Sequence, residues 1–306
     1  MPLWRCVLNK QKGVLFMAQL YESEKEKRKT IIAEGKTKII ERIPREPRKV
    51  RVINKNELTK GDGKDRISWE GKGAFSNKTA CNCFRYLEYY FRRNNMTVPT
   101  HFFEEYDDYS FIAHRVTMYP IETVYRRVAT GSALKRYPGL KEGDLFEVIE
   151  FFYKDDAAGD PYMVFNEETE WYDLYDSKKP VSPETYLGEV PRTAFMPSKE
   201  QLDTIALYQG QIFEALSKAW ADEGTVLVDL KCEYGESLDG IIMLSDDVNA
   251  DCCRLWPFGD KNQMKDKEVF RQMVGEITPA QKAILNKNYL WVVETTSRFP
   301  GNNVTT

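Results

Sequence analysis

Acidic, basic and apolar residues alternate in the stretch LVDLKCEYG, residues 227–235. Successive side chains of a β-strand point to opposite faces, so the pattern predicts a strand with Asp229, Lys231 and Glu233 on one face and apolar residues on the other. Carboxylates beside an amine suit the binding of a cation or a phosphate group. The alternative is the solvated outer face of an ordinary strand.

A hairpin is predicted directly after this strand, because Asp239-Gly240 is a pair that favours a two-residue turn. Centring the turn on this pair places Glu233 directly across from Asp246 on the returning strand. Carboxylates facing each other at about 5 Å between Cβ atoms repel unless a proton or a cation lies between them. Magnesium accepts one or two carboxylates and completes its shell with water and substrate phosphates, so Glu233 and Asp246 are the predicted metal ligands.

Lysines flank a glycine in the stretch EGKTKII, which holds Gly35, Lys36 and Lys38. Glycine lets the backbone approach a phosphate, and the lysines can neutralise it. The spacing is not that of a Walker loop, so a solvated basic turn is the alternative. The stretch GKGAF, residues 71–75, lacks the third glycine of a dinucleotide fingerprint and is given no weight.

A second basic stretch, RRVATGSALKR, places Arg126 shortly before Gly131-Ser132 at the start of a short predicted helix. Such a turn offers free amides and a hydroxyl to an anion, and the arginine adds a bidentate fork. We therefore expect a phosphate or carboxylate pocket here, with a capped helix carrying solvated basic residues as the alternative. Arg254, in DCCRLWPFGDK, is a third basic candidate.

The composition excludes several classes of protein. The 306 residues suffice for two modest domains, and 44 basic against 47 acidic residues create no field that attracts nucleic acid or an anionic membrane, so we expect neither as a partner. Six cysteines without a repeating spacing, and no long apolar segment, predict a cytoplasmic protein with reduced thiols. The two histidines, His101 and His114, are expected to be structural or on the surface. A homo-oligomer is left open.

Short runs rich in isoleucine and valine predict antiparallel strands between residues 31 and 58. Further strand-like pieces occur at 110–117 and 121–129. Apolar residues at helical spacing predict a helix over 77–93, with Asn77 as its cap. The first half of the chain is therefore expected to form a small sheet covered by a helix.

Two later helices are marked by capping boxes, one made by Ser198 and Gln201 and the other by Thr278 and Gln281. Residues 156–197 are rich in turn formers, which favours an irregular segment. Strands and helices are mixed without a regular βαβ alternation. This order favours an α+β architecture over a doubly wound sheet.

Over roughly residues 33–296 the motifs together resemble one family, the phosphoribosylaminoimidazole-succinocarboxamide synthases or SAICAR synthetases. PIETVYRRVATGS (120–132) and LVDLKCEYG (227–235) are similar to its two signature sequences, most closely in the form that begins the animal bifunctional enzyme. GKTK, SNK, KDD, RLWP and KDK also occur in the expected order. The resemblance implies a small antiparallel sheet lobe and a larger α+β domain, with ATP in the cleft between them.

The resemblance also implies an activity and the residues that perform it. The expected reaction is an ATP-dependent ligation in purine biosynthesis that joins L-aspartate to carboxyaminoimidazole ribonucleotide through an acyl phosphate. Five residues are expected to contact ATP: Gly35, Lys36, Lys38, Met118 and Glu122. The ribonucleotide is expected to bind Arg126, Ser132 and Arg254, and Mg²⁺ to bind Glu233 and Asp246. Three residues are expected near the reacting centre, one acid among them taking a proton: Lys231, Asp229 and Asp251.

Three parts of the chain are expected on this basis. Residues 1–16 form a disordered extension, residues 17–117 a small sheet lobe with one helix on the phosphate side of ATP, and residues 118–306 the larger domain with the substrate and metal sites. Some positions depart from the family pattern, among them Lys60 and Asn249. A non-catalytic paralogue that binds nucleotide or scaffolds the pathway is therefore the alternative, whereas a kinase-like enzyme is disfavoured because HRD and DFG sequences are absent.

Overall fold

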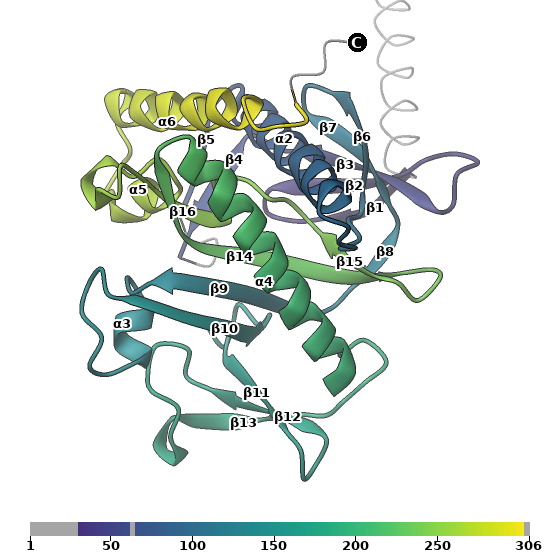
Figure 1. The fold of residues 1–306 in the computed structure, drawn as a ribbon, viewed down its shortest axis with the longest axis vertical. Helices are drawn as coiled ribbons and strands as arrows, with labels where there is room; N and C mark the ends of the chain where they lie inside the picture. The colour runs from purple at the N-terminus through teal and green to yellow at the C-terminus, as the bar shows by residue number, and fades with distance from the viewer. Residues whose placement is uncertain (1–29, 62–64, 303–306) are drawn as a thin grey trace, which may run out of the picture.

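The computed structural model describes residues 30–61 and 65–302, which form two large antiparallel sheets and the helices that cover them (Figure 1). This arrangement confirms the predicted α+β class. The extension predicted at residues 1–16 lies outside the described residues. No helix in the described part of the chain is long and apolar enough to cross a membrane.

The first sheet has five strands in the spatial order β1-β2-β3-β7-β6, so the antiparallel strands predicted near its start are confirmed. In its third strand, Val50, Val52 and Asn54 are buried and the residues between them only partly so, as expected of a sheet with one covered face. The long helix α2 (Lys72–Arg93) covers that face. The strands are β1 (Ile31–Glu34), β2 (Lys38–Arg42), β3 (Lys49–Asn54), β6 (Phe102–Asp107) and β7 (Ser110–His114).

The start of α2 corrects a prediction, because the helix begins at Lys72 and Asn77 is not its cap. Gly71 precedes it with a φ of 91°, in the left-handed region that glycine adopts readily. Asn77 lies inside the helix, fully buried, and its side-chain amide donates to the carbonyl oxygen of Asp107 at 2.9 Å. A buried amide is tolerated within a helix when a neighbouring strand end supplies such an acceptor.

The second sheet has nine strands, with β13-β12-β11-β10-β9-β14-β15 in spatial order and β16 and β8 also paired with β14. Three of these strands fall within residues 156–197, so the prediction of an irregular segment there is wrong. These strands are short and separated by turn residues, which hides their pattern in the sequence. The members are β8 (Val116–Met118), β9 (Ile121–Val128), β10 (Leu145–Tyr153), β11 (Tyr162–Asn166), β12 (Trp171–Tyr175), β13 (Tyr186–Val190), β14 (Thr225–Ser237), β15 (Ile242–Ser245) and β16 (Cys253–Pro257).

The hairpin between β14 and β15 differs from the prediction by one residue. Glu233 pairs with Ser245 and not with Asp246. The amide of Gly240 donates to the Ser237 carbonyl at 3.0 Å, and Gly240 has a φ of 76°. This geometry is a turn followed by a left-handed glycine, which makes a three-residue loop and shifts the register by one position.

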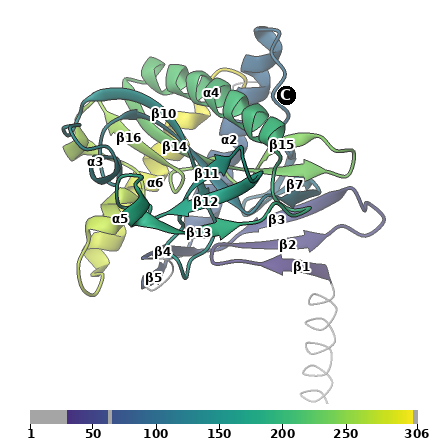
Figure 2. The same ribbon diagram turned by 90° about the horizontal axis from the view of Figure 1, so that it is seen from below.

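Helices α4 (Lys199–Asp222) and α6 (Pro279–Ser297) begin at the predicted capping boxes, and both predictions are confirmed. α4 packs on β14, while α2 contacts both α4 and α6, so one apolar core joins the two sheets. Figure 2 shows α4 and β1 at opposite sides of the molecule. The remaining elements are α3 (Ala133–Arg136), α5 (Glu268–Gln272), η1 (Pro183–Thr185), η2 (Lys261–Gln263) and the hairpin of β4 (Glu57–Lys60) and β5 (Asp65–Ser68).

Candidate functional site

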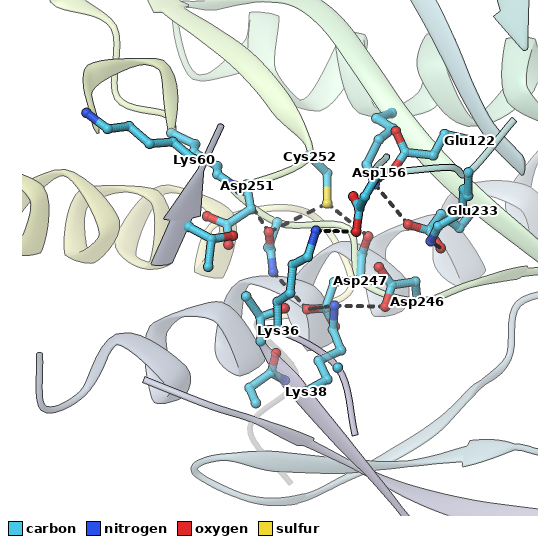
Figure 3. A pocket seen from close by; sticks show the side chains of 18 of the residues that line it. Lys36, Lys38, Lys60, Glu122, Asp156, Glu233, Asp246, Asp247, Asp251 and Cys252 are labelled. Carbon is cyan, nitrogen blue, oxygen red and sulfur yellow. Dashed lines mark hydrogen bonds and ion pairs between the residues drawn. The ribbon is translucent and has the colours of Figure 1, made fainter. Parts of the chain in front are cut away.

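A cavity of about 540 Å³ is lined by residues from both sheets and from the segments that connect them. Its wall is dominated by charged side chains from distant parts of the sequence (Figure 3). Eight of the residues singled out from the sequence line it: Gly35, Lys36, Lys38, Glu122, Lys231, Glu233, Asp246 and Asp251. The structure thus brings most of the predicted nucleotide, metal and reaction residues together.

Lys38 bridges two adjacent carboxylates at one wall of the cavity. Its Nζ lies 2.8 Å from Asp246 Oδ1 and 2.9 Å from Asp247 Oδ2. Burial opposes the charge on Lys38, but the two carboxylates outweigh it and raise the pKa of Lys38 well above its usual value. Burial also raises the pKa of Asp247 to about 6, with Lys38 acting against it. The buried His101 donates from Nε2 to the Asp246 carbonyl at 2.9 Å, so this histidine is structural, as predicted.

The predicted face of β14 carries a network of ion pairs. Lys231 lies 2.8 Å from Glu122 and 2.9 Å from Glu233, and Lys154 lies 2.5 Å from the other oxygen of Glu233. The side chain of Glu233 is 9% exposed, which contradicts the alternative of a solvated strand face. The opposite face of the strand is buried as predicted.

Glu233 and Asp246 line the same cavity although they are not a cross-strand pair. Asp246 follows β15 with a φ of 59°, so the chain leaves the strand there, and Figure 3 shows both carboxylates on one side of the cavity. In residues 30–61 and 65–302 no group of three or more His, Cys, Asp or Glu side chains is placed to hold a metal ion. Two carboxylates fit Mg²⁺, which takes its other ligands from water and phosphate.

Asp251 is held by two side chains that no sequence motif indicated. Lys72 at the start of α2 lies 2.8 Å from Asp251 Oδ2 and is 1% exposed, and the hydroxyl of Tyr289 on α6 donates to the other oxygen. Burial opposes the charge on Asp251, yet Lys72 holds the pKa of this carboxyl well below its usual range. Lys72 lies in GKGAF, which was given no weight, and its partner lies 179 positions away, so no local signal in the sequence indicated this residue.

Arg126, Ser132, Arg254 and Asp229 gather in a second cluster, outside the residues that line the cavity. Arg126 lies 2.5 Å from Glu150 and 3.0 Å from Asp229, and it donates to the Ser132 hydroxyl at 3.3 Å. Arg254 forms an ion pair with the same oxygen of Asp229. The predicted anion-binding residues are therefore brought together, with Asp229 between the two arginines.

Met118 is the predicted residue that the structure places apart from both groups. It ends β8, pairs with Gly235 and is 38% exposed, and it does not line the cavity. Lys36 lines the cavity and is ion-paired to Asp156 at 2.6 Å, with the two side chains 39% and 59% exposed.

Comparison with known proteins identifies the family. The SAICAR synthetase family matches residues 31–288. The chain is 35% identical over 246 residues to the phosphoribosylaminoimidazole-succinocarboxamide synthase of Herpetosiphon aurantiacus, which covers 80% of this chain and 88% of that protein. A solved SAICAR synthetase (type-2) in complex with ADP has a TM-score of 0.68 and 27% identity, covering 87% of this chain and 97% of that one. The chain belongs to the SAICAR synthetase family, which confirms the resemblance.

Animal multifunctional proteins are also similar to this chain. It is 38% identical over 266 residues to the multifunctional protein ADE2 of Gallus gallus, which covers 86% of this chain. The chain spans 57% of that protein and 58% of the corresponding protein of Caenorhabditis elegans.

Proposed function

We propose that this chain is an ATP-dependent ligase that joins L-aspartate to carboxyaminoimidazole ribonucleotide, giving SAICAR, ADP and phosphate. One observation carries the proposal. In this chain, a member of the family, one cavity brings the lysines predicted to bind phosphate close to the carboxylates of the second sheet. A solved relative was obtained in complex with ADP. In this proposal Gly35, Lys36, Lys38 and Glu122 face the nucleotide.

The chemistry explains why charged residues suffice. A carboxylate is a poor electrophile, so its oxygen first attacks the terminal phosphorus of ATP, the bond from that phosphorus to the bridging oxygen breaks, and an acyl phosphate and ADP form. Phosphoryl transfer depends mainly on positioning and charge neutralisation, which lysines supply. The aspartate amine then attacks the acyl carbon, forms the amide bond and releases phosphate. Lys231 lies between Glu122 and Glu233 in the cavity, where its ammonium can neutralise charge on the phosphoryl group.

Glu233 and Asp246 would hold Mg²⁺ in this proposal. Bound there, the ion neutralises phosphate charge and orients the nucleotide. Both carboxylates are paired with lysines in the structure, Glu233 with Lys231 and Lys154 and Asp246 with Lys38. These ion pairs hold the two carboxylates at the cavity wall.

The proton released from the aspartate amine needs an acceptor. Asp251 is a weak one, because Lys72 holds its pKa well below the usual range. Asp229 is bound by Arg126 and Arg254. The phosphate that leaves takes up this proton and departs as hydrogen phosphate. We therefore assign both acids an orienting role, in which Asp229 aligns the two arginines for the phosphate of the ribonucleotide and Ser132 adds a hydroxyl. The Met118 side chain is left without a role in the cavity.

The five cysteines of the described residues are free thiols, which supports a reducing compartment and our assignment to the cytoplasm.

Omitting one substrate at a time tests the proposed activity. With ATP and magnesium present, we expect ADP and the succinocarboxamide product only when aspartate and the ribonucleotide are both added. Nucleotide binding without product would instead support a non-catalytic paralogue.

A further inference from the structure

Lys267 differs from the other lysines that line the cavity. Lys72, Lys154 and Lys231 each have a carboxylate oxygen at 2.5–2.9 Å, and the lysines of the first sheet are paired too. For Lys267, no carboxylate of the described residues lies within 4.0 Å of Nζ. Burial lowers the pKa of Lys267, and the neighbouring Arg271 adds to this effect, although Asp251 opposes it. A cation that is partly removed from water without a partner favours an anionic ligand.

Arg271 lies one helical turn beyond Lys267 and also lines the cavity. Its backbone amide donates to the Lys267 carbonyl at 3.1 Å, so the two side chains stand on one face of α5. Its guanidinium contacts Glu268 at 3.2 Å and is 41% exposed, which leaves donors for a ligand. The two residues present a pair of cations four positions apart, which we name the α5 cation pair.

Hydrogen bonds connect both ends of α5 to other parts of the molecule. At its start, Asp266 accepts the amides of Glu268 at 2.7 Å and of Leu255 at 2.8 Å. At its end, Lys60 donates to the carbonyl oxygens of Phe270, at 3.4 Å, and of Met273. The Lys60 ammonium also lies 4.8 Å from the centre of the Phe270 ring, and its side chain is 14% exposed. A helix of five residues has little stability of its own, so these contacts determine where α5 sits.

We propose that Lys60 is a positioning residue that holds the α5 cation pair at the cavity wall, where the pair binds a carboxylate of the acidic amino-acid substrate. This inference rests on the proposed ligase function. Figure 3 shows Lys60 and Asp251 on the side of the cavity away from Glu122 and Glu233. The carboxylate subsite is therefore separate from the proposed magnesium ligands.

The charges of the cavity favour this ligand. Lys36 and Lys38 serve the nucleotide in our proposal, and Arg126 and Arg254 serve the ribonucleotide. L-Aspartate carries two carboxylates and needs cations that are not already neutralised. Lys267 meets this requirement, and Arg271, although it contacts Glu268, keeps further donors for the same carboxylate.

Steady-state kinetics of Lys267→Met test the subsite. We expect the KM for aspartate to rise about tenfold or more, the loss of one charge-assisted contact, with little change in the KM for ATP or for the ribonucleotide. The matched control is Lys265→Met, a nearby lysine outside the cavity lining, which should leave all three values unchanged. A rise in the KM for the ribonucleotide instead, or no change in any KM, would overturn the assignment.

Lys60→Met tests the positioning role. We expect a smaller rise in the KM for aspartate with kcat largely kept, and substantial rescue by Lys60→Arg, which retains a cation able to reach the α5 carbonyls. Because Lys60 acts through α5, the effects of Lys60→Met and Lys267→Met on the KM for aspartate should be less than additive in the double variant. Additive effects of the two substitutions, or a loss of folding stability with an unchanged KM for aspartate, would contradict the positioning role.

A binding measurement separates this inference from the proposed function. Succinate has the two carboxylates of aspartate but no amine, and calorimetry can follow its binding to the folded protein in the presence of ADP. We expect binding to the unaltered chain and at least tenfold weaker binding to Lys267→Met. Equal succinate affinity in both proteins would overturn the subsite. If the unaltered chain binds succinate in this way but forms no product, the function fails and the subsite stands.

Discussion

At Glu233, lysine ammonium groups occupy the space that sequence reasoning assigned to a repelling carboxylate. Lys231 and Lys154 contact one oxygen each, and Asp246 is turned out of the strand toward Lys38. The carboxylate therefore stabilises the cavity wall as well as serving as a proposed metal ligand. A neutral side chain would leave the lysines without their counter-charge.

The variant Glu233→Gln should lose activity and also stability. Because the Glu233 side chain is only 9% exposed, we expect the free energy of unfolding of the variant to be about 1–3 kcal/mol lower than that of the parent, measured by urea denaturation without ligands. Its activity should also need more magnesium. A variant that is more stable than the parent would show that repulsion, and not ion pairing, dominates at this position.

Lys72 offers a second test at the residue scale. It is 1% exposed and neutralises Asp251, so Lys72→Met leaves a buried charge without its partner. We expect the free energy of unfolding to drop by about 3–5 kcal/mol. The matched control is Lys78→Met on the same helix, where the lysine is 44% exposed and the loss should be below about 1 kcal/mol. Similar losses in both variants would contradict this reading of the Lys72 pair.

Single residues show what the sequence can and cannot predict about the site. The alternation around Lys231 predicted the face of the strand correctly, because side-chain direction is a local property. Lys72 is 179 positions away from Asp251 in the sequence, and no local pattern predicts such a contact. The ion pairs of Lys154 with Glu233 and of Asp247 with Lys38 also join residues far apart in the sequence. Only the three-dimensional structure reveals these contacts.

Among the elements, β14 depends on a glycine at the position where β8 pairs with it. A Cβ added at Gly235 would lie 2.8 Å from Val116 Cγ2 and 2.9 Å from the Thr117 carbonyl oxygen. Gly235→Ala should therefore lower the free energy of unfolding by about 1–3 kcal/mol in denaturant titrations. Gly210→Ala on α4 is the control, since nothing lies near its Cβ and alanine favours a helix. An unchanged stability for Gly235→Ala would show that β8 can move aside freely.

The pH dependence of stability should report on the start of α5. Burial raises the pKa of Asp266 to about 6, above the value of about 3.9 in an unfolded chain. The folded state then binds the proton more tightly, so the contribution of Asp266 is fully present below about pH 4 and is lost as the pH rises through about 6. Urea unfolding at several pH values should therefore show a smaller decline between pH 4 and 6 in Asp266→Asn than in the parent. Equal slopes in that window would contradict the raised pKa.

Elements with a strong local signal were predicted well. Capping boxes marked the starts of α4 and α6 correctly, because both partners of each box lie within one turn. Asp239-Gly240 indicated a hairpin, but a left-handed glycine fits both a two-residue and a three-residue loop, so the register was one residue off. Strands β11, β12 and β13 escaped prediction because each has only five residues and lies among turn formers, although they pair with their neighbours in the chain.

At the scale of the whole molecule, the cavity exists because two sheets share one core. The turn between β1 and β2 and the start of β2 supply the lysines near Gly35, and β14 and the segment after β15 supply the carboxylates. The fold class followed from the mixed order of strands and helices together with the family resemblance. The strand order and the joining of the sheets through α2 depend on packing between distant segments, which sequence periodicity does not encode.

The most direct measurement of the proposed ligase chemistry follows the oxygen atoms of the carboxylate. Carboxyaminoimidazole ribonucleotide labelled with ¹⁸O in both carboxylate oxygens is incubated with the chain, ATP, magnesium and aspartate, and the products are weighed by mass spectrometry. An acyl phosphate transfers one labelled oxygen to each phosphate released and leaves the other in the amide. Unlabelled phosphate, or ADP formed without amide, would contradict the account.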